Sequence, residues 1–157
     1  MRDLALAPLA DDHTDALRAL SVHDWQKVFS GQPAEHLDNP GDLDTHVILR
    51  SDHVVGMFRI DPRYHLTHTF AQSNTPGLRS FIVDRDRQGS GIGRAACRLL
   101  PGYVREHYPR SAALYLTVNQ RNAGAYKAYT LGGFTDTGAE YLLGHAGPQH
   151  ILRMPLL

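Results

Sequence analysis

The spacing at which hydrophobic residues recur changes along the chain, and it distinguishes predicted strands from predicted helices. In ALYLTV (113–118), apolar and polar residues alternate, which indicates a strand with one buried face. Within 92–103, apolar residues recur three and four positions apart, as in an amphipathic helix. The segment LRSFIVD (78–84) is almost continuously apolar, which predicts a strand buried on both faces.

Turn residues and periodicity predict the remaining elements. We expect a first strand at 4–9, a helical stretch at 16–36 that is broken near Ser30 and Gly31, and a hairpin at 45–61. A short helix at 122–131 and a closing antiparallel pair at 134–157 should follow. Asp11 or Asp12 should cap the first helix, because a carboxylate oxygen accepts from free first-turn amides. This order predicts an α/β sandwich with a mixed sheet, in one domain spanning 1–157.

Composition narrows the range of partners. A chain of 157 residues with 42% hydrophobic and 20% charged residues is typical of a globular protein. Sixteen basic residues balance sixteen acidic ones, which argues against binding to nucleic acid or an anionic membrane. No apolar run approaches the ~18 residues of a membrane span, and Asp3 and Pro8 do not suit a signal peptide. We therefore expect a cytoplasmic protein.

The segment RQGSGIGRA (87–95) is the strongest candidate for a binding site. It places three glycines between the apolar strand and the amphipathic helix. Backbone N–H groups at the start of a helix attract anions, and glycines allow phosphate oxygens to approach the backbone of Gln88 through Arg94. A tight turn without a ligand is the alternative for a glycine cluster taken alone.

Two familiar phosphate-binding patterns do not match this loop. A Walker loop requires Lys and then Ser or Thr after its last glycine, whereas Arg94 and Ala95 follow Gly93. The dinucleotide fingerprint requires GxGxxG with an acidic residue roughly 20 positions later, where this chain has Ala112 and Ala113.

A third pattern matches. QGSGIG resembles the Q/R-x-x-G-x-G/A signature of the GNAT superfamily of acyl-CoA-dependent N-acyltransferases, with Gln88, Gly91 and Gly93 at its defining positions. The segment LTVNQRNAGAYKAYTLGGF (116–134) resembles the motif that follows it in that family. The resemblance covers 78–134 and implies a GNAT-type fold, in which a mixed, mostly antiparallel sheet with splayed central strands is flanked by helices.

The resemblance also implies a reaction and a set of site residues. Acetyl-CoA would be the cosubstrate, and its acetyl group would pass to an amine by direct attack. Tyr129 matches the family's proton donor to the leaving sulfur, whereas Tyr126 lies off that helix face. The expected cofactor-binding residues are Phe81, Ile82, Val83, Gln88, Gly89, Ser90, Gly91, Ile92, Gly93, Arg94, Asn122, Ala125 and Tyr129.

The general base is not evident from the sequence. Many relatives have a glutamate on the strand before the glycine loop, and this strand has none. Candidate substitutes are Asp61, His65, His68 and Glu140. The HLTH segment (65–68) lacks helical spacing and a third ligand, so we expect no metal. We interpret Cys97 as a core residue rather than a nucleophile.

The acceptor is the least determined feature. By resemblance its walls come from VHDWQKVFSG (22–31) and GAEYLLGH (138–145), where Trp25, Phe29 and Tyr141 are candidate contacts. A small-molecule amine and a protein amine both remain open, as does a homodimer, which is common among relatives. The alternatives are a non-catalytic acyl-CoA sensor, suggested by the missing glutamate, and a nucleotide-binding protein.

Overall fold

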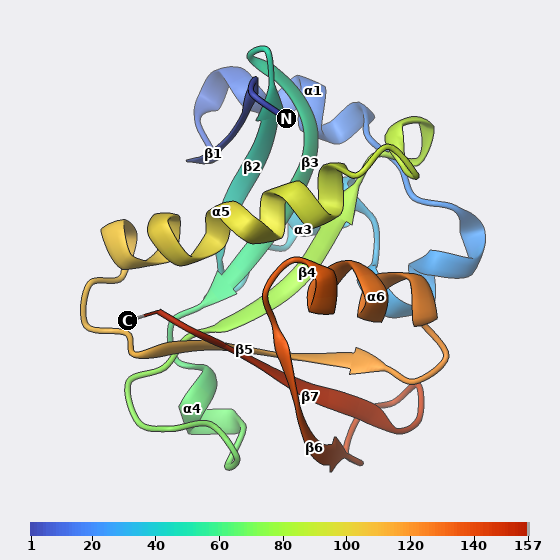
Figure 1. Cartoon of the computed structure of the whole chain (residues 1–157). Helices are drawn as coiled ribbons and strands as arrows, with labels where there is room; N and C mark the ends of the chain where they lie inside the picture. Colours follow the sequence, from blue (N-terminus) through green and yellow to red (C-terminus); the bar gives the residue numbers. More distant parts are fainter. Residues whose placement is uncertain (157) are drawn as a thin grey trace.

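The structure, a computed structural model, describes residues 1–156 and is organised around one seven-stranded sheet (Figure 1). Its strands are β1 (Leu4–Pro8), β2 (Asp44–Arg50), β3 (His53–Asp61), β4 (Gly77–Val83), β5 (Ala113–Asn119), β6 (Thr135–Tyr141) and β7 (Gln149–Pro155). Their order in the sheet is β1-β2-β3-β4-β5-β7-β6. The β4–β5 pair is parallel and the other pairs are antiparallel. The expected mixed, mostly antiparallel sheet is confirmed.

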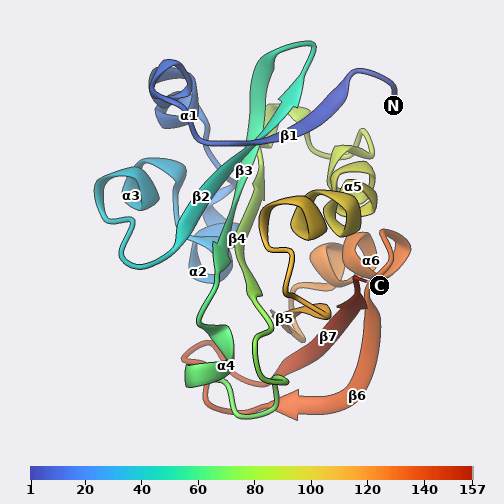
Figure 2. The same ribbon diagram turned by 90° about the vertical axis from the view of Figure 1, so that its left-hand side faces the viewer.

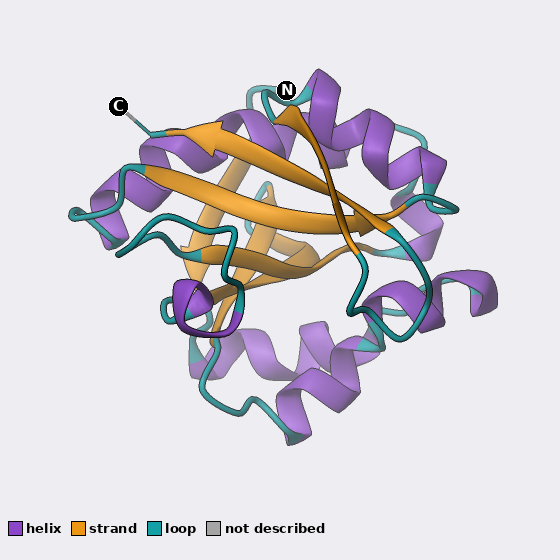
Figure 3. Ribbon diagram, turned by 90° about the horizontal axis from the view of Figure 1, so that it is seen from below, coloured by secondary structure: helices purple, strands orange, loops and turns teal. Residues whose placement is uncertain are grey.

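Helices cover both faces of this sheet. The helices are α1 (Thr14–Ala19), α2 (Lys27–Ser30), α3 (Pro33–Asp38), α4 (Tyr64–Thr67), α5 (Ile92–His107) and α6 (Ala123–Leu131). Figure 2 shows α1, α2 and α3 on one side of the strands and α5 and α6 on the other. In the view from below, the strands likewise lie between two groups of helices (Figure 3).

The two faces of β3 explain this layered arrangement. Phe58 and Ile60 pack into the larger core beneath α5, whereas Met57 packs with Leu17 and Ile82 into a second core beneath α1. Neighbouring strand residues point to opposite faces, so a strand that is apolar throughout requires cover on both sides. The sheet is therefore enclosed near β3 and can open only where neighbouring strands separate.

The sheet opens between its two central strands. β4 and β5 are paired only at Gly77 and Tyr115, at the start of β4. Beyond that point β4 contains a bulge: Met57 and Arg59 of β3 face Ile82 and Arg79, so one extra residue lies on the β4 side. Ser80 lies in this bulge with a φ of 51°. A bulge bends its strand and interrupts pairing, and the splayed strands expected from the sequence are therefore present.

Three local expectations were wrong. Asp11 and Asp12 lie within a 3₁₀ turn, and no side chain caps α1. The expected break near Ser30 and Gly31 is present between α2 and α3, but a second break follows α1, because the backbone at Ser21 hydrogen-bonds to Asp84 and Arg85 instead of continuing a helix. β4 is not buried on both faces, since Arg79 is exposed and the bulge faces the opening between β4 and β5.

Candidate active site

A cavity of about 390 Å³ occupies the space where β4 and β5 separate. Its walls are formed by residues 78–81 of β4, 116–119 of β5, one face of α6, α2, and the loop between β6 and β7. Unpaired strand backbone is therefore exposed to a space that a ligand can enter. An extended ligand arm placed there can pair with the edge of β4 as an added strand does.

The face of α6 that the sequence predicted to be functional lines this cavity. Asn122, Ala125 and Tyr129 contribute to the wall, as their shared helix face requires. The ring of Tyr129 packs edge-on against Phe81 and Phe134, with ring centroids 5.8 and 5.7 Å away. Burial raises the pKa of the Tyr129 hydroxyl above its usual value, so the group stays protonated at neutral pH.

Tyr126 lies one position beyond Ala125 but has a different environment. Its hydroxyl donates to Asp136 Oδ2 at 2.9 Å, and its ring packs on His150 with centroids 4.5 Å apart. It does not contribute to the cavity wall. The two tyrosines of α6 therefore form a matched pair, one beside the cavity and one outside it.

The glycine loop leads directly into the first turn of α5. Gly89 and Gly91 have φ angles of +82° and +87°, a region that favours glycine. A Cβ built at Gly89 would meet no atom within 4 Å, and one at Gly91 would meet only the Arg94 guanidinium at 4.0 Å. The loop backbone is therefore open to a ligand, and the first-turn amides of α5 face the same end of the helix.

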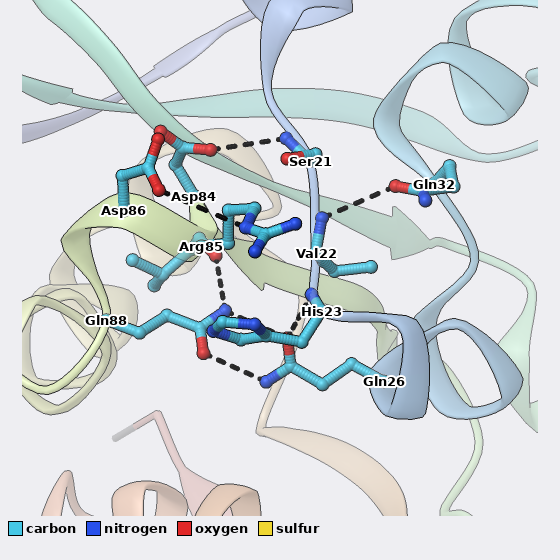
Figure 4. Close-up of polar contacts among 10 residues, drawn as sticks. Ser21, Val22, His23, Gln26, Gln32, Asp84, Arg85, Asp86 and Gln88 are labelled. Atoms are coloured by element: carbon cyan, nitrogen blue, oxygen red, sulfur yellow. Dashed lines mark hydrogen bonds and ion pairs between the residues drawn. The ribbon is translucent and has the colours of Figure 1, made fainter.

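Gln88 holds the loop through a hydrogen-bond network (Figure 4). Its Nε2 donates to Val83 O at 2.9 Å and to Gln26 Oε1 at 3.0 Å, while Gln26 Nε2 donates back to Gln88 Oε1 at 3.0 Å. Ser21 strengthens the same junction, because its N–H donates to Asp84 Oδ1 at 3.2 Å. The Gln88 side chain therefore positions the loop rather than facing a ligand. Nothing in the sequence pattern pointed to Gln26.

The remaining residues predicted to bind the cofactor differ in whether their side chains or only their backbone groups are accessible. Phe81 lines the cavity. A Cβ built at Gly93 would lie 3.9 Å from the Val83 side chain, so these two residues are neighbours. Ile82 and Ile92 are buried in the two cores, so only their backbone groups are available. Ser90 and Arg94 are exposed on the loop and the first helical turn, and Ser90 Oγ donates to Arg87 O at 2.8 Å.

The residues predicted to contact the acceptor also differ in whether they line the cavity. Phe29 and Tyr141 line the cavity, whereas Trp25 is 58% exposed and lies outside the cavity wall, so its contact with the acceptor stays a prediction. Among the four candidate bases, His68 alone lines the cavity. Glu140 is exposed and accepts from Gln120, and Asp61 accepts from the Arg63 N–H.

His68 is held in a defined orientation. Its ring stacks on Tyr64 with centroids 3.8 Å apart, and its Nδ1 lies 3.2 Å from Tyr64 O. The same Nδ1 lies 2.9 Å from Thr67 Oγ1, and the Thr67 hydroxyl donates to Tyr64 O at 3.3 Å. Both oxygens therefore accept from the ring, so Nδ1 carries the proton and Nε2 has a free lone pair. Burial lowers the pKa of His68 below its ordinary value, which keeps the imidazole neutral at pH 7.

The described part of the chain contains neither a cluster of metal ligands nor a membrane-spanning helix. Within residues 1–156, no three His, Cys, Asp or Glu side chains gather closely enough to hold a metal ion. Within the same residues, no helix is sufficiently long and apolar to cross a membrane.

The sheet opens after its parallel pair, a glycine loop precedes α5, and α6 places a tyrosine beside the opening. This arrangement is that of the GNAT class of acyltransferases. Residues 9–134 match the sequence model of the Acetyltransferase (GNAT) family, and the chain belongs to that family. It is 29% identical to the "Uncharacterized N-acetyltransferase YbbJ" of Bacillus subtilis (strain 168), over 96% of each chain.

Solved structures share the fold. The aminoglycoside acetyltransferase AAC(6')-Ib in complex with coenzyme A superposes with a TM-score of 0.77 at 12% identity, covering 97% of this chain and 94% of that one. The spermidine N-acetyltransferase of Vibrio cholerae, in complex with CoA and spermine, gives a TM-score of 0.70 at 14% identity, with 99% and 97% coverage. At these identities the likeness concerns the fold.

Proposed function

We propose that the protein moves an acetyl group from acetyl-CoA to a primary amine by direct attack in a ternary complex. The observation that carries this proposal is the separation of β4 from β5 after Gly77, which leaves a cavity between the two strands with Tyr129 in its wall. Coenzyme A is bound in the solved neighbours AAC(6')-Ib and spermidine N-acetyltransferase, which supports the choice of cosubstrate. The whole of 1–157 would act as one domain.

Acetyl-CoA would lie with its pyrophosphate at the glycine loop and its pantetheine arm in the cavity. The N–H groups from Gln88 to Arg94 would bind the pyrophosphate, because they lie at the positive end of α5. The arm would pair with the backbone of Phe81, Ile82 and Val83, and Asn122 and Ala125 would form the opposite wall. The thioester would then lie beside the β4 bulge.

The amine nitrogen would attack the thioester carbonyl, which forms a C–N bond and places negative charge on the oxygen. A backbone N–H of β4 near Phe81 would stabilise that oxyanion. When the C–S bond breaks, the sulfur leaves as a thiolate and takes the Tyr129 hydroxyl proton. The Tyr129 hydroxyl is protonated at neutral pH, so its proton is available when the thiolate forms.

His68 would receive the proton that the amine loses. An alkylamine has a pKa of ~10.4, and its deprotonation at pH 7 costs roughly 4–5 kcal/mol. A neutral imidazole with a free Nε2 at the cavity wall can accept this proton, either directly or through a water molecule. In this chain a histidine directly after α4 would thus replace the glutamate that many relatives place on the strand before the glycine loop.

Isothermal titration with acetyl-CoA and CoA tests the proposal. Gly91→Glu adds a carboxylate where the pyrophosphate would lie. Gly41→Glu is the matched control, because Gly41 also has a positive φ (+61°) and no atom within 4 Å of a built Cβ, but lies in the loop before β2. We expect micromolar binding by the wild type and Gly41→Glu, and loss of binding in Gly91→Glu.

The outcomes separate the candidate functions. Absence of acetyl-CoA binding by the wild type refutes the acetyltransferase proposal. Binding without thiol release in the presence of a broad amine panel identifies a non-catalytic acyl-CoA sensor instead. Binding with amine-dependent thiol release supports the enzyme.

A further inference from the structure

We propose that the amine acceptor of this enzyme carries an anionic group, a carboxylate or a phosphate, and that Arg79 binds it, supported by the positive charge of the neighbouring Arg59. This inference rests on the proposed function and specifies the acceptor class for the same site. It is drawn from the positive charge of Arg59 and Arg79 rather than from the elements that would bind CoA.

The two arginines lie side by side beneath the reaction site. Arg59 of β3 and Arg79 of β4 are direct cross-strand partners, so both side chains lie on the same face of the sheet. This is the face covered by α1, α2 and α3, because Met57 and Ile82 on it pack against Leu17. Arg79 lines the cavity.

Arg59 is directed at the bulge where the thioester would lie. Its Nη2 donates to Ser80 Oγ at 2.8 Å, and Ser80 also lines the cavity. Its Nε is buried without a hydrogen-bond partner. Arg59 itself does not line the cavity, so its positive charge would act on a bound anion from behind Ser80 and beside Arg79.

The positive charge of the pair has no acidic partner. Among residues 1–156, neither arginine has a carboxylate within ion-pair distance. Asp61, two residues further along β3, turns instead to the Arg63 N–H at 2.9 Å. Burial, and then the like charge of Arg79, lower the pKa of Arg59, and Arg79 also lowers the pKa of His68.

Like charges directly opposite each other on neighbouring strands are unfavourable. An anion bound beside them removes this repulsion, and guanidinium groups bind carboxylates and phosphates through paired hydrogen bonds. Among residues 1–156, no carboxylate lines the cavity, so a polycationic amine would find no counter-charge from them there. Phe29, Tyr141 and Leu143 supply an apolar wall for the rest of the acceptor. An amino acid with an apolar side chain combines all of these features.

Acetylation of matched amines tests the assignment, with CoA release as the readout. One series compares L-phenylalanine with L-phenylalaninamide and 2-phenylethylamine, and another compares L-methionine with L-methioninamide. Glucosamine 6-phosphate against glucosamine distinguishes phosphate from carboxylate, and spermidine represents polycations. We expect the anionic member of at least one series to have a kcat/KM about 10- to 100-fold above its neutral counterpart, the value of one or two charge-assisted hydrogen bonds.

Substitution of the arginines provides the second arm. Arg79→Met should raise the KM of the anionic amine by about tenfold or more while leaving its neutral counterpart and acetyl-CoA binding unchanged, and Arg79→Lys should restore part of the loss. Arg59→Met should act in the same direction. Arg110→Met, at an exposed position outside the cavity wall, is the control.

Three results would overturn the assignment. These are a preference for spermidine or for the neutral amines, an anion preference that survives in both arginine variants, and failure to acetylate any anionic amine by protein that binds acetyl-CoA. Failure to bind acetyl-CoA, in contrast, would overturn the proposed function itself.

Discussion

Acidification should destabilise this protein through one buried histidine. His46 of β2 is 4% exposed, and its ring stacks on Phe58 with centroids 5.0 Å apart. The Tyr108 hydroxyl donates to Asp44 at 2.6 Å, so its oxygen accepts from His46 Nε2 at 3.0 Å, and Nδ1 accepts from the Tyr103 hydroxyl. Both ring nitrogens are therefore hydrogen-bonded in the neutral form. A proton added to Nδ1 would point at the Tyr103 hydroxyl, which acts as a donor in this arrangement.

The size of the effect follows from the pKa of His46. Burial lowers it from 6.5 to about 4, with Asp44 raising it and His107 lowering it to smaller extents. Because the folded-state pKa lies below the unfolded-state value, the stabilisation is complete above pH 6.5 and is lost as the pH falls towards 4. The full loss is about 3 kcal/mol, of which about 2 kcal/mol falls between pH 7 and pH 5. That is a large part of a typical free energy of unfolding, ~5–15 kcal/mol.

Urea unfolding at pH 7, 6 and 5 measures this loss in the wild type and in His46→Gln. The variant should be less stable at pH 7, because the Tyr103 and Tyr108 hydroxyls lose their partner, but its stability should fall less with acid, by about 2 kcal/mol over that range. His53→Gln, at the exposed first position of β3, controls for removal of one imidazole. Parallel pH dependences for the wild type and His46→Gln would refute the reasoning.

Further predictions concern the reaction, the fold and the single cysteine. Tyr129→Phe should lower kcat about 100-fold with acetyl-CoA affinity unchanged, whereas Tyr126→Phe should not, and a normal kcat in Tyr129→Phe would exclude it as the proton donor. Gly77→Ala should lower the free energy of unfolding by about 1–3 kcal/mol, because its Cβ would lie 2.0 Å from the Tyr64 ring; a wild-type urea midpoint would contradict this. Burial raises the pKa of Cys97 to about 12, so a thiol reagent should label it only after unfolding, and fast labelling of native protein would disprove its burial.

The sequence alone determined the elements around the cofactor site and their order. The run from β4 through the glycine loop to α5 was evident because periodicity and turn residues act over a few positions. The α6 face bearing Asn122 and Tyr129 was evident for the same reason, since helical spacing fixes which side chains share a face. The missing acid on β4 was also visible, and it directed attention to other proton acceptors.

Tertiary structure decided the contacts between segments distant in sequence. The break after α1 has no local signal, because Ser21 is held extended by Asp84, 63 positions away. The pairing of Gln26 with Gln88, the burial of His46 against Tyr103 and Tyr108, and the opposition of Arg59 and Arg79 depend likewise on sheet register and packing. Register is set by the whole sheet and by the β4 bulge rather than by any short stretch of residues. For that reason the sequence could indicate a cofactor loop, whereas the charge of the acceptor cavity emerged only when the strands were placed together.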